Sequence, residues 1–118
     1  RFSKYLNGQF KKYGLPYSAR RTPRSGAFYS LTSSDIMFFN TPSDSILDRM
    51  HWENKNVSQW DIYGWYEDAL RKENTVGTHK TPIIIVRRPN RDVEFAIMNV
   101  KDMVKILLDI DILMHEKD

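Results

Sequence analysis

Apolar residues recur at helical spacing in three segments of the chain. One apolar stripe runs through residues 2 to 13, a second through residues 59 to 73, and a third through the segment after Asn99. The third has the clearest period, with apolar positions at i, i+3, i+4, i+7 and i+8, namely Val100, Met103, Val104, Leu107 and Leu108. Ser58, with Asp61 three residues on, matches a capping box before the second segment. The pattern therefore predicts three amphipathic helices.

Shorter apolar runs between these helices predict five strands. The most apolar is "TPIIIVRR", which we expect to be central in a sheet, and "PNRD" is typical of a hairpin turn into "VEFAIM". The other three are "YSARRT", "SDIMFFN" and a strand from about Ser45 to Lys55. The predicted order is α-β-β-β-α-β-β-α, which indicates one α/β domain over residues 1–118 with a mixed β-sheet flanked by helices.

Charge is unevenly distributed along the chain. The 118 residues carry a formal net charge of only +3, but the first 34 contain no Asp or Glu. Basic residues gather in that part of the sequence: Lys11, Lys12, Arg20, Arg21 and Arg24. Such a block is typical of a phosphate-binding surface and equally of an ordinary solvated basic face.

The composition excludes several classes of protein. There is no cysteine, so disulfides and thiolate metal sites are ruled out, which is compatible with a reducing cytosol. No apolar run approaches the roughly 20 residues of a membrane span, so no membrane association is expected. The chain starts at an arginine, and we expect an N-terminal piece to be missing.

Candidate chemistry lies in "DRMHWENKN", residues 48 to 56. On a strand, Glu53 and Lys55 share one side and Asn54 points to the other. Asp35 opens the preceding strand, and a hairpin would bring it beside Glu53. Two carboxylates and one backbone carbonyl, that of Asn54, form half of the octahedral shell of Mg²⁺, with Mn²⁺ as an alternative ion. The simpler interpretation is a surface charge pair between Glu53 and Lys55.

A metal site here would favour phosphodiester hydrolysis. Lys55 would lie beside a metal-bound water and help to orient or deprotonate it, while the ion lowers the pKa of that water. The scissile phosphate would be held by the basic residues and by backbone amides of the glycine turn, namely Arg20, Arg21, Arg24, Ser25 and Gly26.

An acidic residue followed by Glu-x-Lys resembles the active site of the PD-(D/E)xK nuclease superfamily. Together with the first amphipathic helix, Gly-Leu-Pro, the basic strand and "RTPRSGA", it resembles the archaeal-type and phage Holliday-junction resolvases. The resemblance implies a restriction-endonuclease-like fold, metal ligation by Asp35 and Glu53, a catalytic Lys55, and phosphate contacts from Arg21, Arg24 and Ser25. It further implies a homodimeric, Mg²⁺-dependent endonuclease that cuts four-way DNA junctions in the cytoplasm of a prokaryotic or phage-infected cell.

The sequence departs from this family at two points. Ser34 stands where the family has proline, next to the metal ligand. The family also carries an acid on its first helix, so the residue before Arg1 would have to supply it; otherwise the site has two carboxylates or is inactive. Two rivals remain open, a nuclease of the same fold that acts on other DNA in repair or restriction, and a non-catalytic DNA-binding module.

The remaining aromatic and histidine residues have two interpretations each. Trp60, Tyr63 and Trp65 are expected to pack under the sheet or in a protein interface, or else to stack on unpaired bases. A homodimer is expected to use the second helix, with Trp60, Trp65 and Tyr66, or the nearby sheet edge, and the apolar last helix offers further material for such an interface. His51 is expected to be a half-buried structural residue, or else a phosphate contact or proton shuttle.

Overall fold

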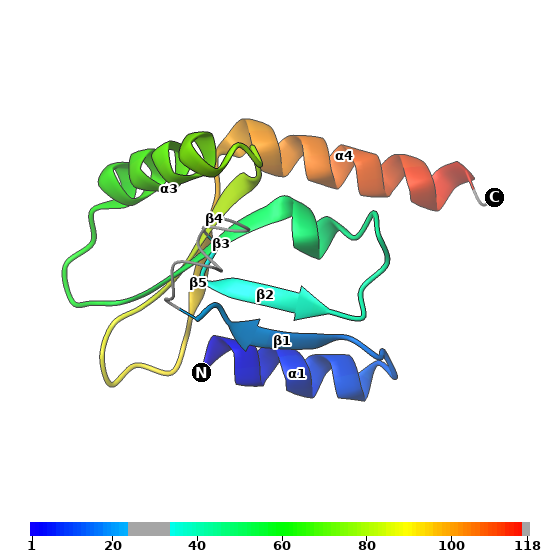
Figure 1. Cartoon of the computed structure of the whole chain (residues 1–118), viewed down its shortest axis with the longest axis horizontal. Helices are drawn as coiled ribbons and strands as arrows, with labels where there is room; N and C mark the ends of the chain where they lie inside the picture. The colour runs from blue at the N-terminus through cyan, green and yellow to red at the C-terminus, as the bar shows by residue number, and fades with distance from the viewer. Residues whose placement is uncertain (24–33, 117–118) are drawn as a thin grey trace.

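The computed structural model describes residues 1–23 and 34–116, and in these ranges the predicted order of helices and strands is confirmed. The elements are α1 (Phe2–Lys12), β1 (Ser18–Arg21), β2 (Ile36–Phe39), the 3₁₀ helix η1 (Ile46–Arg49), β3 (Met50–Asn56), α3 (Ile62–Val76), β4 (Thr81–Arg87), β5 (Phe95–Ile97) and α4 (Val100–Glu116). The chain is an α/β protein in which α3 and α4 lie on one side of the strands and α1 on the other (Figure 1).

The described strands form two small sheets. β4 is central in the larger one, parallel to β3 and antiparallel to β5, so the prediction of a mixed sheet with a central "TPIIIVRR" strand is confirmed. α3 makes the crossover that two parallel strands require. β1 and β2 pair antiparallel as a separate two-stranded sheet.

The main core lies between α1 and the two sheets. Phe2, Leu6 and Phe10 recur every four residues on α1 and turn one face of the helix toward the strands. The helix is also tied to β1 by a paired contact, in which the Asn7 amide donates to the Ala19 carbonyl at 2.9 Å and accepts from the Ala19 N–H at 2.7 Å. α1 therefore covers one face of β1 and fixes the position of the basic strand.

Alternation along β3 sends its side chains to two different environments. Met50 and Trp52 belong to the core on the α1 side, where Trp52 meets the Phe2 ring at a centroid distance of 5.6 Å. His51 and Glu53 point to the opposite side, under α3, and both are buried. One face of this strand is thus apolar and the other carries ionisable groups away from water.

β3 is an edge strand of its sheet, and the segment before β2 covers that edge. The Trp52 N–H donates to Ser34 Oγ at 2.8 Å, and the Asp35 N–H donates to the Trp52 carbonyl at 2.7 Å. These contacts join the β1–β2 sheet to the β3–β4–β5 sheet. They also place Asp35 beside the second half of β3.

Two predicted boundaries were wrong. The second helix begins at Ile62, not at residue 59, because Asp61 is its N-cap and accepts from the Gly64 N–H at 3.0 Å. The strand predicted from Ser45 begins at Met50, after the 3₁₀ turn η1. That turn is held by the Trp52 indole, which donates to the Leu47 carbonyl at 3.0 Å.

The last helix, α4, leaves most of its apolar residues in contact with solvent. Among its side chains Ile106 packs against the core, while those exposed include Val100, Leu107, Leu108, Ile112, Leu113 and Met114. Its C-terminal half extends beyond α3 (Figure 1). Among the described helices, none combines the length and the apolar run needed to cross a bilayer.

Candidate functional site

Asp35 is fixed beside β3 by three backbone contacts. Its carbonyl accepts from the Thr22 N–H at 2.8 Å and its own N–H donates to Trp52. Its carboxylate oxygen Oδ2 accepts from the Asn54 N–H at 2.9 Å. That amide points outward from an edge strand, so the Asp35 side chain takes the place of a missing strand neighbour. Asp35 therefore lies beside the second half of β3, but the predicted hairpin was wrong, because among the described strands β2 pairs with β1 and β3 pairs with β4.

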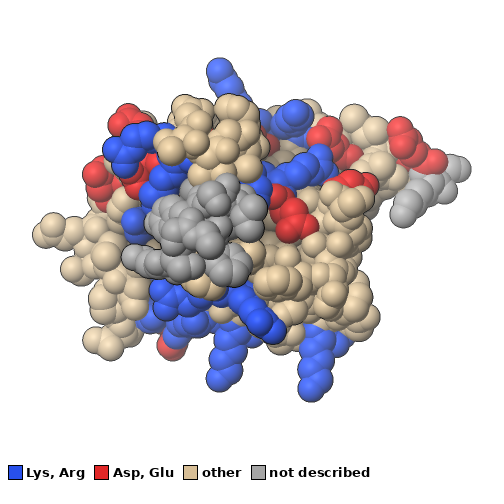
Figure 2. Space-filling model, in the orientation of Figure 1, with Lys and Arg blue, Asp and Glu red and all other residues tan. Residues whose placement is uncertain are grey.

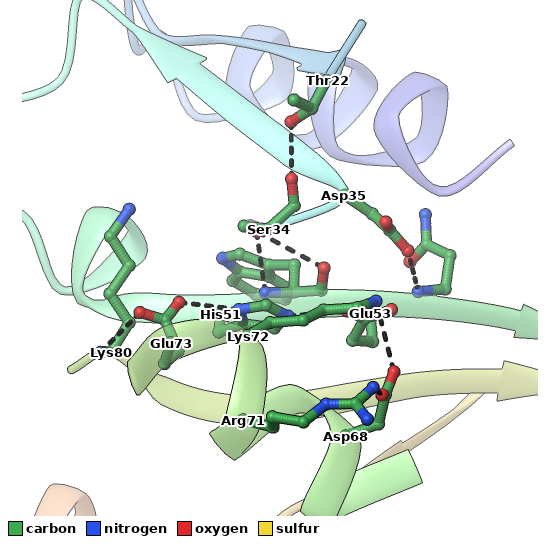
Figure 3. A network of polar contacts seen from close by, with 12 residues as sticks. Thr22, Ser34, Asp35, His51, Glu53, Asp68, Arg71, Lys72, Glu73 and Lys80 are labelled. Atoms are coloured by element: carbon green, nitrogen blue, oxygen red, sulfur yellow. Dashed lines mark hydrogen bonds and ion pairs between the residues drawn. The ribbon is translucent and has the colours of Figure 1, made fainter. Parts of the chain in front are cut away.

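Glu53 is buried and its carboxylate is held from two sides. Its Oε1 lies 2.7 Å from His51 Nε2 and 3.1 Å from Lys72 Nζ on α3 (Figure 3). Only 3 % of Glu53 is exposed and none of His51 is, so these contacts are shielded from water.

Behind His51 lies a second buried carboxylate, Glu73 of α3. His51 Nδ1 lies 2.6 Å from Glu73 Oε1. The second oxygen of Glu73 accepts from the Thr78 hydroxyl and from the Lys80 N–H. The result is a continuous buried chain from Glu73 through His51 to Glu53, which we call the Glu–His–Glu chain.

The geometry favours a charged His51. The pKa values of Glu53 and Glu73 are both lowered, and an ionised carboxylate only accepts hydrogen bonds, so a ring between the two carboxylates donates from both nitrogens as an imidazolium. Burial lowers the pKa of His51, but the bonds to Glu53 and Glu73 outweigh it and raise that pKa above 6.5. Burial likewise opposes ionisation of Glu53, yet the bonds from His51 and Lys72 lower its pKa to about 2.

Asp35 and Glu53 adjoin closely enough to influence each other. Burial raises the pKa of Asp35; the Asn54 N–H opposes the rise, and the neighbouring Glu53 carboxylate adds to it. Two carboxylates brought together in this way repel each other unless a proton or a cation lies between them. The pair therefore presents oxygen ligands that a cation would stabilise.

The oxygen donors around this pair fit a partly hydrated Mg²⁺. Asn54 Oδ1 is buried beside Asp35 and has no hydrogen-bond partner among the described residues. In residues 1–23 and 34–116 no cluster of three or more His, Cys, Asp or Glu side chains is arranged to hold a metal. Mg²⁺, however, is commonly bound by one or two carboxylates and keeps several waters. Asp35 and Glu53 supply that number.

A cleft opens in front of Asp35, and its lining contains more cationic than acidic side chains. It is lined by Arg1, Phe2, Arg21, Thr22, Asp35, Asn54, Lys55, Asn56, Ile85, Arg87 and Glu94. Figure 2 shows Lys and Arg side chains gathered in the lower half of the view, over α1 and β1. A polyanion that entered the cleft would meet several cations close to the carboxylate pair.

The two predicted arginines of β1 lie in different surroundings. Arg21 lines the cleft, whereas the Arg20 guanidinium lies 5.4 Å from the centre of the Phe39 ring and is not among the lining residues. Arg24, Ser25 and Gly26, also predicted to hold phosphate, lie outside the described residues.

Lys55 lines the cleft, but it is not the lysine bonded to Glu53. Its Nζ lies 5.8 Å from the centre of the Trp65 ring, in a cation–π contact with α3. The lysine in contact with Glu53 is Lys72, which also bridges to Asp68 at 3.4 Å. The carboxylate pair thus has one lysine in the cleft and another behind it.

Lys72, Glu73 and the full burial of His51 were missed by the sequence prediction, which expected a half-buried structural histidine. A signal was present on the second helix. Trp65, Ala69 and Glu73 follow each other at i, i+4 and i+8, so a carboxylate occupies a position on the buried stripe. Because a buried carboxylate must be paired, that position called for a cationic partner on the strand beneath.

The pH dependence of stability is predicted from these shifts. Folding raises the pKa of His51 from its ordinary value of 6.5. The stabilisation of the folded protein by charged His51 is therefore complete below pH 6.5, and it is lost as the pH rises through the folded-state pKa. The pKa of Glu53 is lowered, so its contribution is complete above 4.5 and is lost as pH falls toward about 2. We therefore expect the Glu–His–Glu chain to stabilise the protein most between pH 4.5 and pH 6.5.

Urea unfolding in EDTA measures this. The free energy of unfolding of the unmodified protein should fall as the pH rises above that range, and it should fall less in His51→Gln. An equal fall in both proteins would contradict the assignment.

Comparison with models of protein families, with curated proteins and with solved structures gave no match for this chain. Its function is therefore inferred from the geometry of the site.

Proposed function

We propose that this chain is a Mg²⁺-dependent, structure-selective DNA endonuclease of the Holliday-junction resolvase type, with a restriction-endonuclease-like fold. The observation that carries the proposal is that Asp35, just before β2, adjoins Glu53 of β3 and lines a cleft that also carries four cationic side chains. Carboxylates near cations are the arrangement that metal-assisted phosphodiester hydrolysis needs. We place its action in the cytoplasm of a prokaryotic or phage-infected cell.

Each residue at the site has a role in this proposal. Asp35 and Glu53, with the Asn54 carbonyl, would hold the ion, which when bound supplies Lewis-acid chemistry and a more acidic water. Lys55 orients or deprotonates the attacking water from within the cleft. His51 and Lys72 hold the Glu53 carboxylate through its Oε1 atom.

The phosphate is held by cations of the cleft. Arg21 lies on β1 and Arg87 at the end of β4, so the two approach a bound strand from different elements. The guanidinium of Arg87 is anchored by a bond to the Arg91 carbonyl at 3.1 Å. Guanidinium groups bind phosphate oxygens with directional hydrogen bonds, so both arginines are suited to this role.

A cleavage assay tests the proposal. Labelled four-way junction, flap and linear duplex DNA are each incubated with the protein in Mg²⁺ and in EDTA. Mg²⁺-dependent cutting of the junction in preference to the others supports the proposal. Preference for flap or duplex supports a nuclease of the same fold in repair or restriction. Binding without cleavage supports a DNA-binding module, and the absence of binding contradicts all three.

Salt dependence is expected to separate the two arginines of β1. Arg21→Ala should reduce the slope of log affinity against log salt concentration by about one unit, since one phosphate contact is lost. Arg20→Ala is the matched control, because Arg20 stacks on Phe39 and does not line the cleft. Equal slopes for the two variants would place the DNA elsewhere.

A homodimer is part of the proposal, because a four-way junction has two-fold symmetry and needs two matched cuts. Trp65 and Tyr66 of the predicted interface are partly buried and Trp60 precedes α3, which moves the proposed interface to α4. The first half of α4 has a net positive charge, from Lys101, Asp102 and Lys105, and the second half is acidic, with Asp109, Asp111 and Glu116. An antiparallel second copy would pair the two halves by charge and cover the exposed apolar residues.

Light scattering checks the dimer. We expect twice the mass of one chain, which is 14.0 kDa, and a return to the single mass in Leu107→Lys, because Leu107 is exposed on α4. Lys101→Ala is expected to weaken the dimer without abolishing it. The mass of one chain for the unmodified protein would exclude the dimer and favour a nicking nuclease.

A further inference from the structure

A second cleft lies between the loop before α3 and the β4–β5 hairpin. It is lined by Trp60, Arg88, Asn90, Arg91, Asp92, Val93 and Phe95. Trp60 comes from the loop, and the other residues come from the hairpin and the first position of β5. Phe95 is 54 % exposed and Trp60 is 36 % exposed. Two aromatic rings thus meet solvent in a concave surface that also contains arginines.

The rings are held in a fixed arrangement. Their centroids are 6.2 Å apart with an angle of 63° between the planes, an edge-to-face contact. The Trp60 indole N–H donates to the Val57 carbonyl at 3.2 Å, so the polar atom of the ring is already bonded. The Arg88 guanidinium lies 5.7 Å from the centre of the Trp60 ring. The exposed part of the two rings is therefore flat apolar surface next to the Arg88 guanidinium.

This second cleft is connected to the one in front of Asp35 through a third hollow that shares lining residues with both. Phe95 and Asp92 also line a neighbouring hollow, and that hollow shares Arg1, Phe2 and Glu94 with the cleft of the carboxylate pair. Asp92 brings a negative charge to the path, and its carbonyl accepts from the Arg1 guanidinium at 2.9 Å. A nucleic-acid strand held at the carboxylate pair could extend along this surface to the aromatic rings.

We propose that the cleft at Trp60 and Phe95 binds an unpaired nucleobase of DNA by stacking, while Arg88 and Arg91 contact the phosphates on either side. The proposal rests on the proposed function as a DNA-cleaving protein. Every nucleobase has an apolar face that stacks on aromatic side chains, and arginines beside such rings follow the backbone. Branched DNA exposes bases where stacking is interrupted, so this site would favour branched over continuous duplex.

The competing role is purely structural, in which Trp60 and Phe95 pack the hairpin against the loop before α3. Both roles require apolar side chains, but only stacking requires rings. Phe95→Leu separates them, because leucine retains the apolar contact and removes the aromatic face. Phe95→Tyr retains the ring and serves as the conservative variant. Tyr63→Leu is the matched control, because Tyr63 is 82 % exposed on α3 and does not line this cleft.

The test measures binding in EDTA, so no cleavage is needed. Fluorescence anisotropy with a labelled oligothymidine strand and with a blunt duplex gives two affinities for each variant. We expect Phe95→Leu to bind the single strand about tenfold more weakly, the effect of losing one stacked base, and to bind the duplex as the parent does. Phe95→Tyr and Tyr63→Leu should bind both as the parent does.

The outcomes distinguish this inference from the proposed function. Unchanged single-strand affinity in Phe95→Leu, with duplex binding intact, would overturn the stacking site and leave the nuclease proposal standing. An equal loss for strand and duplex would show a structural role and also overturn it. If the unmodified protein bound neither DNA, the proposed function as a DNA-cleaving protein would be contradicted. Thermal unfolding of each variant verifies that it is folded, and Trp60→Leu provides an independent second variant.

Discussion

Replacing Asp35 with asparagine is expected to slow Mg²⁺-dependent DNA cleavage by at least about 100-fold, since a catalytic metal stabilises the transition state by several kcal/mol and each 1.36 kcal/mol is a factor of ten. Asparagine has nearly the same shape and its oxygen still accepts from the Asn54 N–H, so the fold is retained. DNA binding in EDTA should stay the same or become slightly tighter, because a negative charge is removed from the cleft. Rates on a four-way junction and anisotropy measure the two effects.

Asp44→Asn is the matched control for this variant. Asp44 is exposed in the loop after β2 and does not line the cleft, so the same chemical change there should leave both cleavage and binding unaffected. Cleavage by Asp35→Asn at the parent rate would show that Asp35 is not a metal ligand, and the Asp35 and Glu53 pair would then be a structural contact only.

Glu73→Ala is expected to lower the free energy of unfolding by about 3–5 kcal/mol, the usual cost of removing one partner from a buried ion pair. The substitution leaves the His51 imidazolium buried with one carboxylate instead of two. It also leaves the Thr78 hydroxyl and the Lys80 N–H without the oxygen to which they donate. Urea unfolding at a pH between 4.5 and 6.5, where His51 is protonated and Glu53 ionised, measures the effect.

Two further variants help to explain the loss of unfolding free energy expected for Glu73→Ala. Glu73→Gln keeps the shape and one acceptor oxygen but not the charge, so its destabilisation should be intermediate. Glu67→Ala, at an exposed position of the same helix, should change stability by no more than about 0.5 kcal/mol. If Glu73→Ala were as mild as Glu67→Ala, the Glu–His–Glu chain would contribute little to stability, and His51 would be neutral in the folded protein.

The succession of elements could be predicted from the sequence because it depends on local pattern. Alternation and helical spacing are properties of neighbouring residues, and the apolar run of β4 marks a strand covered on both faces. The helix boundary failed because Ser58 and Asp61 are both suitable caps, and only the path of the loop decides between them. The 3₁₀ turn at Ile46–Arg49 was missed because the Trp52 indole that holds it comes from the following strand.

The residues of the site likewise include some that local pattern predicts and others that it does not. Asp35, Glu53 and Lys55 could be proposed because they lie on consecutive predicted strands and match a known spacing. The contact of Glu53 with Lys72 could not, because it spans 19 residues and depends on how α3 is rotated over β3. That rotation is set by packing of the whole helix, which no short stretch of sequence encodes. The same reason explains why Lys55 lies against Trp65 and not against Glu53.

The side chains of Ser34 and Asp35 occupy the open edge of β3, where a further strand would otherwise add. They accept from the N–H groups of Trp52 and Asn54, two amides that would face water if the segment before β2 moved away. Hydrogen exchange at these amides is therefore governed by local opening of that segment and not by global unfolding. The same opening would uncover an unpaired strand edge, the kind of surface at which chains join into larger β-structures. Asp35 thus protects the protein from self-association at the same place where it is proposed to bind metal.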